Sequence, residues 1–158
     1  RVKPDMVILG KALSGGAYPV SAVLADNHIM EVITPGTHGS TFGGNPLAMA
    51  VGNTIMDIVS SKKFLENIKR LSKYFFSNLN LLKEKYPKVI KDIRGRGYLV
   101  GIQLYKDQTK FIQKLMDKKL LTIRAAEKVI RVLPPLNVKK NELDQALKII
   151  NRVCTELK

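Results

Sequence analysis

The sequence has a single cysteine and no apolar run long enough to cross a membrane. Because Cys154 stands alone, an intramolecular disulfide framework and a cysteine-based zinc site are excluded, and a reducing, cytoplasmic setting fits. Glycine and proline, at 11 and 7 of 158 residues, are too scarce for a low-complexity chain. No long apolar stretch follows the basic residues at the start, so we expect no signal peptide. A composition of 45% hydrophobic and 25% charged residues is that of an ordinary soluble globular domain.

Acidic residues are also scarce, and the resulting positive charge is unevenly distributed. The chain has 27 Lys and Arg against 13 Asp and Glu, a net charge of +14. Residues 1–61 hold three bases and four acids, which sum to −1, whereas residues 62–158 hold 24 bases and nine acids, which sum to +15. This change predicts a domain boundary near Ser60 and Ser61. A basic nucleic-acid module is one interpretation. The lysines are scattered without interleaved aromatic residues, however, which favours a solvated lysine-rich surface.

The pattern of apolar residues predicts a mixture of strands and helices. Short apolar runs indicate strands over residues 6–9, 18–24, 89–93, 98–104, 120–123 and 129–133. Periodic apolar residues predict helices over 27–33, 46–60, 62–85, 109–119 and 141–157. Asn45 followed by Pro46 is typical of a helix start, and we expect Leu47 and Ile55 to belong to the apolar stripe of that helix, which would be buried against parts that this chain lacks. The last helix looks poorly capped, because lysines stand at its start.

Three familiar motifs are incomplete in this sequence. Gly10-Lys11 lacks the earlier Gly and the following Ser or Thr of a phosphate-binding P-loop. The glycines between Gly95 and Gly101 miss a dinucleotide fingerprint by one residue and lead into a predicted strand. His28 and His38 have no cysteine nearby, so we expect no metal site.

Three segments contain residues that are suited to catalysis or to binding an anion. Lys11 follows a predicted buried strand, where partial burial would make it a usable nucleophile or base; an ordinary surface lysine is the alternative. The hydroxyl- and glycine-rich loop 39–44 leads into a helix start, which suits a phosphate or carboxylate, with a plain turn as the alternative. Arg131 lies in an apolar strand, where its guanidinium needs a carboxylate partner. The alternative there is an edge strand with the arginine head in water.

Together these segments resemble the class III pyridoxal-phosphate-dependent aminotransferases, in particular the ornithine and N-acetylornithine aminotransferases. The resemblance runs in order along the chain and is carried by residues 9–16 (LGKALSGG), 39–47 (GSTFGGNPL) and 129–136 (VIRVLPPL). It implies an α/β fold, namely the C-terminal part of a PLP-dependent transferase of fold type I. Residues 1–61 would be the end of the large parallel-sheet domain, and residues 62–158 the small C-terminal α+β domain.

The resemblance also implies a cofactor and roles for individual residues. Lys11 matches the lysine that forms the Schiff base with pyridoxal 5'-phosphate and moves the proton between substrate and cofactor. Thr41 matches the threonine that binds the cofactor phosphate across the interface of a homodimer. Ser40 matches a position that contacts the substrate, and Arg131 matches the arginine that binds a substrate carboxylate.

The implied reaction moves the terminal amino group of N-acetylornithine or ornithine to 2-oxoglutarate. The expected partners are therefore small amino acids and 2-oxo acids, not nucleic acid or a membrane. The sequence departs from the family in length, since it begins shortly before Lys11. It lacks the upstream phosphate loop, the aromatic residue that stacks on the cofactor ring and the aspartate that pairs with the pyridine nitrogen. We therefore expect a fragment. An alternative is a catalytically inactive fragment that serves as a dimerisation or binding partner of a complementary chain.

Overall fold

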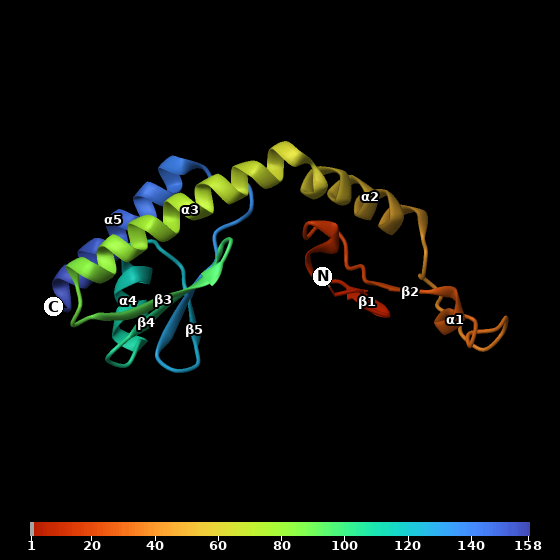
Figure 1. Ribbon diagram of the computed structural model, residues 1–158, viewed down its shortest axis with the longest axis horizontal. Helices are drawn as coiled ribbons and strands as arrows, with labels where there is room; N and C mark the ends of the chain where they lie inside the picture. Colours follow the sequence, from red (N-terminus) through yellow and green to blue (C-terminus); the bar gives the residue numbers. More distant parts are fainter. Residues whose placement is uncertain (1) are drawn as a thin grey trace. The chain divides into compact units, whose positions relative to one another are not determined.

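The computed structural model describes residues 2–158, which divide into two compact units (Figure 1). Unit 1 ends at Phe64, and unit 2 runs from Leu65 to Lys158. The division falls within helix α3 (Lys62–Lys85), close to the change in charge along the chain. Among the described residues, no helix is both long and apolar enough to cross a membrane.

Unit 1 contains two short strands that pair in the opposite sense to the one expected. Its elements are β1 (Met6–Leu9), the 3₁₀ turn η1 (Ala12–Ser14), β2 (Ala22–Ala25), α1 (Asn27–Met30) and α2 (Pro46–Ser60). β1 and β2 are antiparallel, with Leu9 opposite Ala22. The parallel pairing expected for residues 1–61 is therefore not found in the described part of unit 1. A parallel pair needs a crossover, usually a helix, whereas the segment between these strands holds only the single turn η1.

Unit 1 has almost no hydrophobic core of its own. Among residues 2–64, Ala48 is the only buried apolar residue, whereas Ile8, Phe42 and Leu47 are 74%, 76% and 59% exposed. In the apolar stripe of α2, Leu47 is exposed and Ile55 is half-buried. So much exposed apolar surface is unfavourable in water and is typical of an interaction surface.

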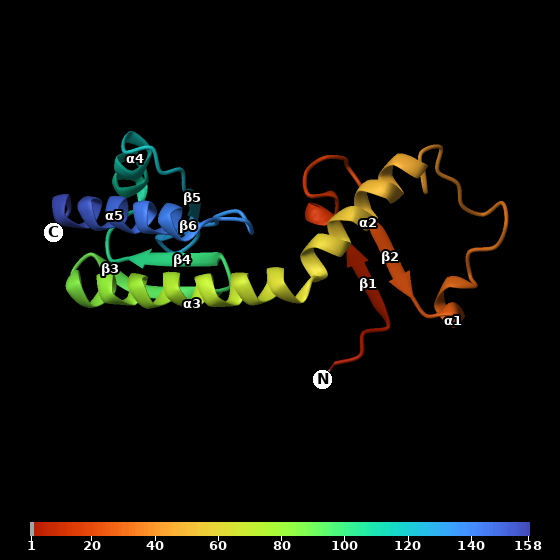
Figure 2. The same ribbon diagram turned by 90° about the horizontal axis from the view of Figure 1, so that it is seen from above.

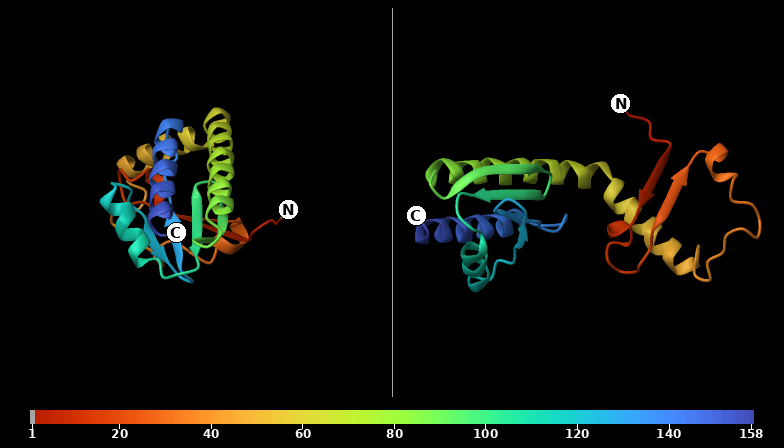
Figure 3. Two further views of the ribbon diagram at one scale, coloured as in Figure 1. Left: turned by 90° about the vertical axis from the view of Figure 1, so that its left-hand side faces the viewer. Right: turned by 90° about the horizontal axis from the view of Figure 1, so that it is seen from below.

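Unit 2 is a two-layer α/β structure. Helix α3 leads into β3 (Ile90–Arg96), β4 (Leu99–Leu104), α4 (Thr109–Asp117), β5 (Ile123–Ala125), β6 (Val129–Val132) and α5 (Lys140–Glu156). The sheet has the order β3-β4-β6-β5, and every neighbouring pair is antiparallel. Helices α3 and α5 lie side by side on one face of the sheet, and the other face carries no helix of residues 65–158 (Figures 2 and 3).

The core of unit 2 lies between the sheet and its helices. Its most deeply buried side chains come from α3, α4, α5 and the strands: Phe75, Leu79, Ile90, Val100, Ile102, Phe111, Leu115, Ile130, Leu143, Ile150 and Val153. Fully burying a side chain of this kind contributes about 1.5–3 kcal/mol relative to leaving it exposed. The core of unit 2 is therefore extensive enough to stabilise its fold without unit 1.

Polar contacts fix how α5 packs against the other two helices. The Tyr74 hydroxyl of α3 donates a hydrogen bond to the Asp144 carboxylate of α5. Near the other end of α5, Glu156 accepts from Lys114 of α4 and from Lys118, which directly follows α4, at 2.6 and 2.7 Å. These hydrogen bonds lower the pKa of Glu156 to about 2. Helix α5 is thereby linked to α3 near its start and to the end of α4 near its own end.

The expectation that α5 is poorly capped is wrong. The Glu142 carboxylate in the first turn accepts a hydrogen bond from the Lys139 backbone N–H at 2.6 Å. An acid at this position satisfies a free backbone donor and interacts favourably with the positive end of the helix dipole.

The hairpin between β3 and β4 contains two glycines with left-handed backbones. Gly95 has a φ angle of 138°, and a Cβ atom there would overlap the carbonyl oxygen of Leu99. Gly97 has a φ angle of 59°, but a Cβ atom there would meet open space. Only Gly95 is therefore required for steric reasons as well as for its backbone angle.

Gly95→Ala should destabilise unit 2 far more than Gly97→Asn. The added methyl group meets the Leu99 carbonyl on a backbone that alanine rarely adopts, so we expect a loss of about 3 kcal/mol or more in the free energy of unfolding. Asparagine tolerates a left-handed backbone, so Gly97→Asn should cost under about 1 kcal/mol. Urea unfolding followed by circular dichroism measures both losses. Equal losses at the two positions would contradict this geometry.

Candidate active site

Lys11 directly follows β1 and has an unusual backbone conformation. Its φ and ψ angles are 56° and −88°, outside the regions that a lysine ordinarily adopts. Such a conformation costs about 1–3 kcal/mol and is concentrated at functional positions. The side chain is exposed, and within residues 2–158 its ammonium group has no hydrogen-bond or ion-pair partner. The buried strand and the partial burial that we expected to make Lys11 a nucleophile or base are therefore not found in the structure. Lys11 has a constrained backbone and an exposed ammonium group.

The turn after Lys11 is fixed against helix α2. Gly15 follows η1 with a φ angle of 61°, and a Cβ atom there would overlap the Ile55 side chain of α2. Ser14 is buried, and its Oγ accepts a hydrogen bond from the Tyr18 N–H at 3.3 Å. Close packing at Gly15 therefore determines how the turn that begins at Lys11 lies on the helix.

The loop before α2 presents free hydroxyl groups beside a capped helix start. As expected, Asn45 caps α2, since its Oδ1 accepts from the Ala48 N–H at 2.9 Å. The Asn45 Nδ2 donates to the Phe42 carbonyl at 2.8 Å, which closes the loop onto the helix. Ser40 and Thr41 are exposed, and their hydroxyl groups make no hydrogen bond within the described part of the chain. Hydroxyl donors at a helix start suit an anion such as a phosphate.

A hollow of about 410 Å³ lies between this loop and the segment that precedes β2. Ser40 lines it from the loop, and residues 18–21 line it from the other side. Gly10, the neighbour of Lys11, lies against the same segment, because a Cβ atom on Gly10 would be 3.3 Å from the Cβ atom of Ser21. Ser40 therefore lines the hollow directly. Lys11 does not line it, but its neighbour Gly10 packs against Ser21, which does.

Arg131 lies in an inner strand of the sheet in unit 2. β6 pairs with β4 on one side and with β5 on the other, so the alternative of an edge-strand arginine is wrong. Ile130 and Val132 are buried in the core, which directs Arg131 to the opposite face. Its Nε atom is buried and has no hydrogen-bond partner among the described residues. Leaving a buried donor unpaired costs about 1–3 kcal/mol, so an acceptor on a bound ligand would be favoured.

Arg94 is a candidate that our sequence reasoning missed. It lies opposite Gly101, and Gly101 lies opposite Arg131, so the three form one row across β3, β4 and β6. Both arginines line a hollow of about 370 Å³ on the face without helices. The Arg94 guanidinium pairs with Glu127 at 2.9 Å, and both side chains are at least half exposed. Only the strand register reveals this row, and a sequence pattern carries no signal for it.

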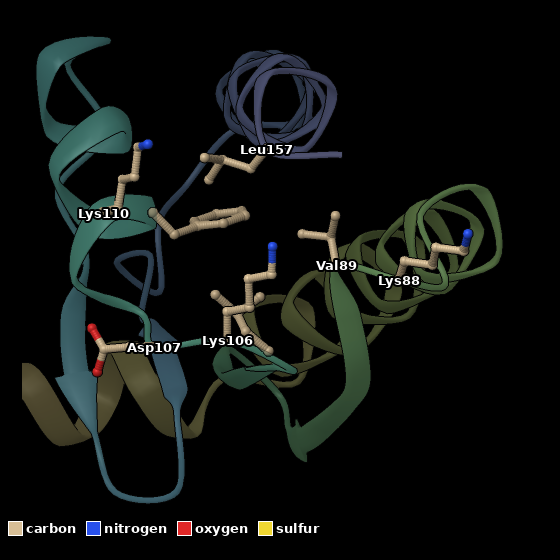
Figure 4. Close-up of a pocket in the computed structure, with 8 residues that line it drawn as sticks. Lys88, Val89, Lys106, Asp107, Lys110 and Leu157 are labelled. Atoms are coloured by element: carbon tan, nitrogen blue, oxygen red, sulfur yellow. The ribbon is translucent and has the colours of Figure 1, made fainter.

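A separate hollow in unit 2 bears on the nucleic-acid interpretation. It has a volume of about 200 Å³ and is lined by Lys88, Lys106 and Lys110 over an apolar floor. Figure 4 shows the Lys106 ammonium group directed into the hollow, whereas Lys88 and Asp107 point away from it. The aromatic ring of the floor belongs to Phe111, which is 1% exposed and offers no stacking surface to a base. This hollow therefore offers a nucleic-acid base no aromatic ring to stack on.

The described residues form neither a metal-binding cluster nor a reactive thiol site. Among residues 2–158, no group of His, Cys, Asp and Glu side chains is placed to hold a metal ion. Burial raises the pKa of the Cys154 thiol to about 12, so it is not a nucleophile at neutral pH.

Known proteins match nearly the whole chain in sequence. The sequence family described as "Aminotransferase class-III" matches residues 1–154. Ornithine aminotransferase 1 of Staphylococcus aureus is 47% identical over 145 residues, which are 92% of this chain and 36% of that protein. Acetylornithine aminotransferase of Oceanobacillus iheyensis is 44% identical over 156 residues, which are 99% of this chain and 39% of that protein.

A solved structure agrees with these sequence matches. The crystal structure of acetylornithine aminotransferase from Elizabethkingia anophelis matches with a TM-score of 0.87 at 44% sequence identity. The match covers 98% of this chain and 40% of that one. The chain thus spans less than half the length of the relatives it matches.

Arg131→Met should leave the stability of unit 2 unchanged or raise it by up to about 1 kcal/mol. Methionine keeps the length of the side chain and removes a buried donor without a partner, and such replacements are often neutral or stabilising. Arg94→Met is the matched control on the same face, where loss of an exposed ion pair should cost under about 1 kcal/mol. Chemical denaturation measures both. A loss above about 2 kcal/mol for Arg131→Met would assign Arg131 a structural role instead.

Proposed function

The chain belongs to the class III aminotransferase family, and from this we propose that it acts as the C-terminal part of an ornithine or acetylornithine aminotransferase. The reaction would move the terminal amino group of ornithine or N-acetylornithine to 2-oxoglutarate. Enzymes of this family use pyridoxal phosphate. The observation that carries the proposal is Lys11. It is the one lysine between Lys3 and Lys62, and a constrained backbone holds it at the end of β1 with its amine free.

Unit 1 has groups that fit pyridoxal 5'-phosphate. The Lys11 amine would hold the cofactor covalently. The hydroxyl group of Thr41, in a glycine-rich loop at a helix start, is a donor that suits the phosphate ester. The loop needs glycine for its tight shape, because a Cβ atom on Gly43 would lie 2.9 Å from the Ser40 Cβ atom.

Each of the four residues then has a distinct task. When bound, pyridoxal phosphate withdraws electrons from the carbon that bears the amino group, which weakens its C–H bond. Once the substrate amine has replaced it on the cofactor, the freed Lys11 Nζ atom would take up that proton and later return one, as a general base and acid. The Arg131 guanidinium holds a substrate carboxylate through two parallel hydrogen bonds and so orients the reacting end. Thr41 binds the phosphate, and Ser40 contacts the substrate.

We assign residues 1–61 to the end of the large cofactor-binding domain and residues 62–158 to the small domain. The contrast in burial supports this assignment, because unit 2 has a full core whereas unit 1 leaves Ile8 and Leu47 exposed. A piece of a larger sheet domain exposes such residues until the rest of the domain covers them. The same exposure favours the alternative of an inactive chain that binds a complementary one. For the complete aminotransferase we expect a cytoplasmic homodimer.

The isolated chain should self-associate despite its net charge of +14. The exposed apolar side chains of unit 1 gain free energy when a second copy covers them. Sedimentation velocity over a range of concentrations measures the association. The double variant Ile8→Lys, Leu47→Lys should remain monomeric to higher concentration. A clean monomer for the unchanged chain at high concentration would contradict this prediction.

Lys11→Ala should abolish turnover in an enzyme completed with an upstream chain. Loss of the covalent anchor and of the proton-transferring amine should lower kcat by roughly three orders of magnitude or more, whereas noncovalent cofactor binding persists. Borohydride reduction of the unchanged enzyme should fix the cofactor to the tryptic peptide that contains Lys11. Lys3→Ala, an exposed lysine of the same unit, is the matched control and should turn over normally. A label on another lysine, or normal turnover of Lys11→Ala, would remove Lys11 from the reaction.

A further inference from the structure

The hollow of about 200 Å³ in unit 2, which we call the Lys106 hollow, lies where the hydrophobic core reaches the surface. Its apolar lining consists of Val89, Leu104 and Phe111, which belong to the core, and Leu157, which packs against the core. Val89 directly precedes β3, Leu104 ends β4, Phe111 lies in the first turn of α4, and Leu157 directly follows α5. The core holds these residues in place. The hollow therefore has a rigid apolar lining, and covering it with an apolar group is favourable in water.

The polar part of the Lys106 hollow is positively charged. Lys88, Lys106 and Lys110 line it, and within residues 2–158 none of their ammonium groups has a hydrogen-bond or ion-pair partner. The one acid of the lining, Asp107, points away from the hollow and accepts a hydrogen bond from the Thr109 N–H at 2.8 Å (Figure 4). The lining thus supplies cations and no carboxylate that faces them.

The neighbouring lysine on the same helix is paired, in contrast. Lys114 lies one turn after Lys110 on α4, and its ammonium group binds the Glu156 carboxylate at 2.6 Å. The chain therefore supplies an anion to the lysine beside the Lys106 hollow but none to the lysines that line it. A ligand with a negative charge and an apolar part complements both properties of the hollow.

The backbone next to Lys106 is fixed from two sides. The Tyr105 N–H donates to the Val89 carbonyl at 3.2 Å, and the Tyr105 carbonyl accepts from Lys128 Nζ at 3.1 Å. Lys128 and Glu127, with φ angles of 62° and 58°, are the central residues of a left-handed type I′ turn between β5 and β6. Figure 4 shows the Lys106 ammonium group directed into the hollow. A fixed backbone thus carries the cation that faces the apolar lining.

The size and the lining of the Lys106 hollow suit a short aliphatic chain. Val89, Leu104 and Leu157 are aliphatic, whereas Phe111 is only 1% exposed and offers no ring face to an aromatic ligand. A methylene group takes up about as much space as a water molecule in the liquid, about 30 Å³, so 200 Å³ holds about seven of them. With the carbon of a carboxylate added, the matching ligand has about eight carbons.

We propose that the Lys106 hollow is a binding site for an aliphatic monocarboxylate of medium chain length. Its carboxylate accepts a charge-assisted hydrogen bond from Lys106, and its chain covers the apolar lining. Lys88 and Lys110 add long-range attraction for the anion. The site shares no residue with Lys11, Ser40, Thr41 and Arg131. It does not rest on the proposed function, and it would take a class of compound that the proposed reaction neither consumes nor forms.

The first test varies the length of the ligand. Butanoate, hexanoate, octanoate and decanoate are titrated into the 158-residue chain at constant ionic strength, below their micelle concentrations, and saturation-transfer NMR follows binding from the ligand signals. Each step of two carbons should tighten binding about tenfold up to octanoate, because each added methylene leaves water. Decanoate should gain less than about twofold over octanoate, because its end stays outside the hollow. An undiminished gain at decanoate would contradict a site of this size.

The second test varies the charge. Octylammonium, which has the same chain and the opposite charge, should bind at least about tenfold more weakly than octanoate. Lys106→Gln should weaken octanoate about tenfold, whereas Lys91→Gln should change it less than about twofold. Lys91 is the matched control, an exposed lysine of β3 that does not line the hollow. If the two variants weaken octanoate equally, the attraction is to the general positive charge and the inference fails. Full affinity in Lys106→Gln would place the binding elsewhere, on the exposed apolar surface of unit 1, and would overturn the inference as well.

The third test shortens the apolar lining. Leu157→Ala should weaken octanoate about fivefold or more and leave butanoate within about twofold, because only the longer chain reaches this residue. Leu81→Ala is the matched control, since Leu81 is an exposed leucine of α3 outside the hollow. Equal losses in the two leucine variants would contradict the assignment. Circular dichroism of each variant checks its fold. Should Leu157→Ala not fold, the comparison of Lys106→Gln with Lys91→Gln, both at exposed positions, still decides the outcome.

Discussion

The antiparallel register of β4 against β6 is the constraint on which the arrangement of unit 2 depends. It sets Ile102 opposite Ile130 on the face that forms the core. By strand alternation it also sets Gly101 opposite Arg131 on the other face. A slip of one residue would bury the arginine and expose the isoleucines, so hydrophobic burial maintains the register. Hydrophobic burial of the isoleucines thus also places Arg131 on the opposite, helix-free face of the sheet.

The two units differ in how their functional groups are held. Arg131 sits on a sheet whose core is complete within residues 65–158. Lys11 keeps an unfavourable backbone that costs about 1–3 kcal/mol in a unit with almost no buried apolar surface to offset it. The packing of Gly15 against Ile55 supplies part of the support. The rest has to come from whatever covers the exposed side of α2, so assembly and the geometry of Lys11 are physically coupled.

Side-chain type and apolar periodicity predicted the features of the fold that depend on neighbouring residues alone. The cap at Asn45 and the full extent of α3 followed from side-chain type and periodicity. β5 begins three residues later than expected, because the Leu120 N–H closes the end of α4 on the Leu115 carbonyl. The order of the strands depends on contacts distant in sequence, which no local pattern records. For the same reason Lys11, Ser40, Thr41 and Arg131 were identified by motif, whereas Arg94 required the register.

The left-handed turn at Glu127 and Lys128 also determines when the sheet can be completed during folding. A hairpin closed by these residues is unstable in isolation, since type I′ turns favour Asn and Gly. Its supports come from elsewhere: Lys128 Nζ donates to the Tyr105 carbonyl at 3.1 Å, and the Lys128 carbonyl accepts from the Leu104 N–H at 3.1 Å. Those partners exist only after β4 has formed on the helices. We therefore expect the β5–β6 hairpin, and with it the row of Arg94, Gly101 and Arg131, to form late in folding.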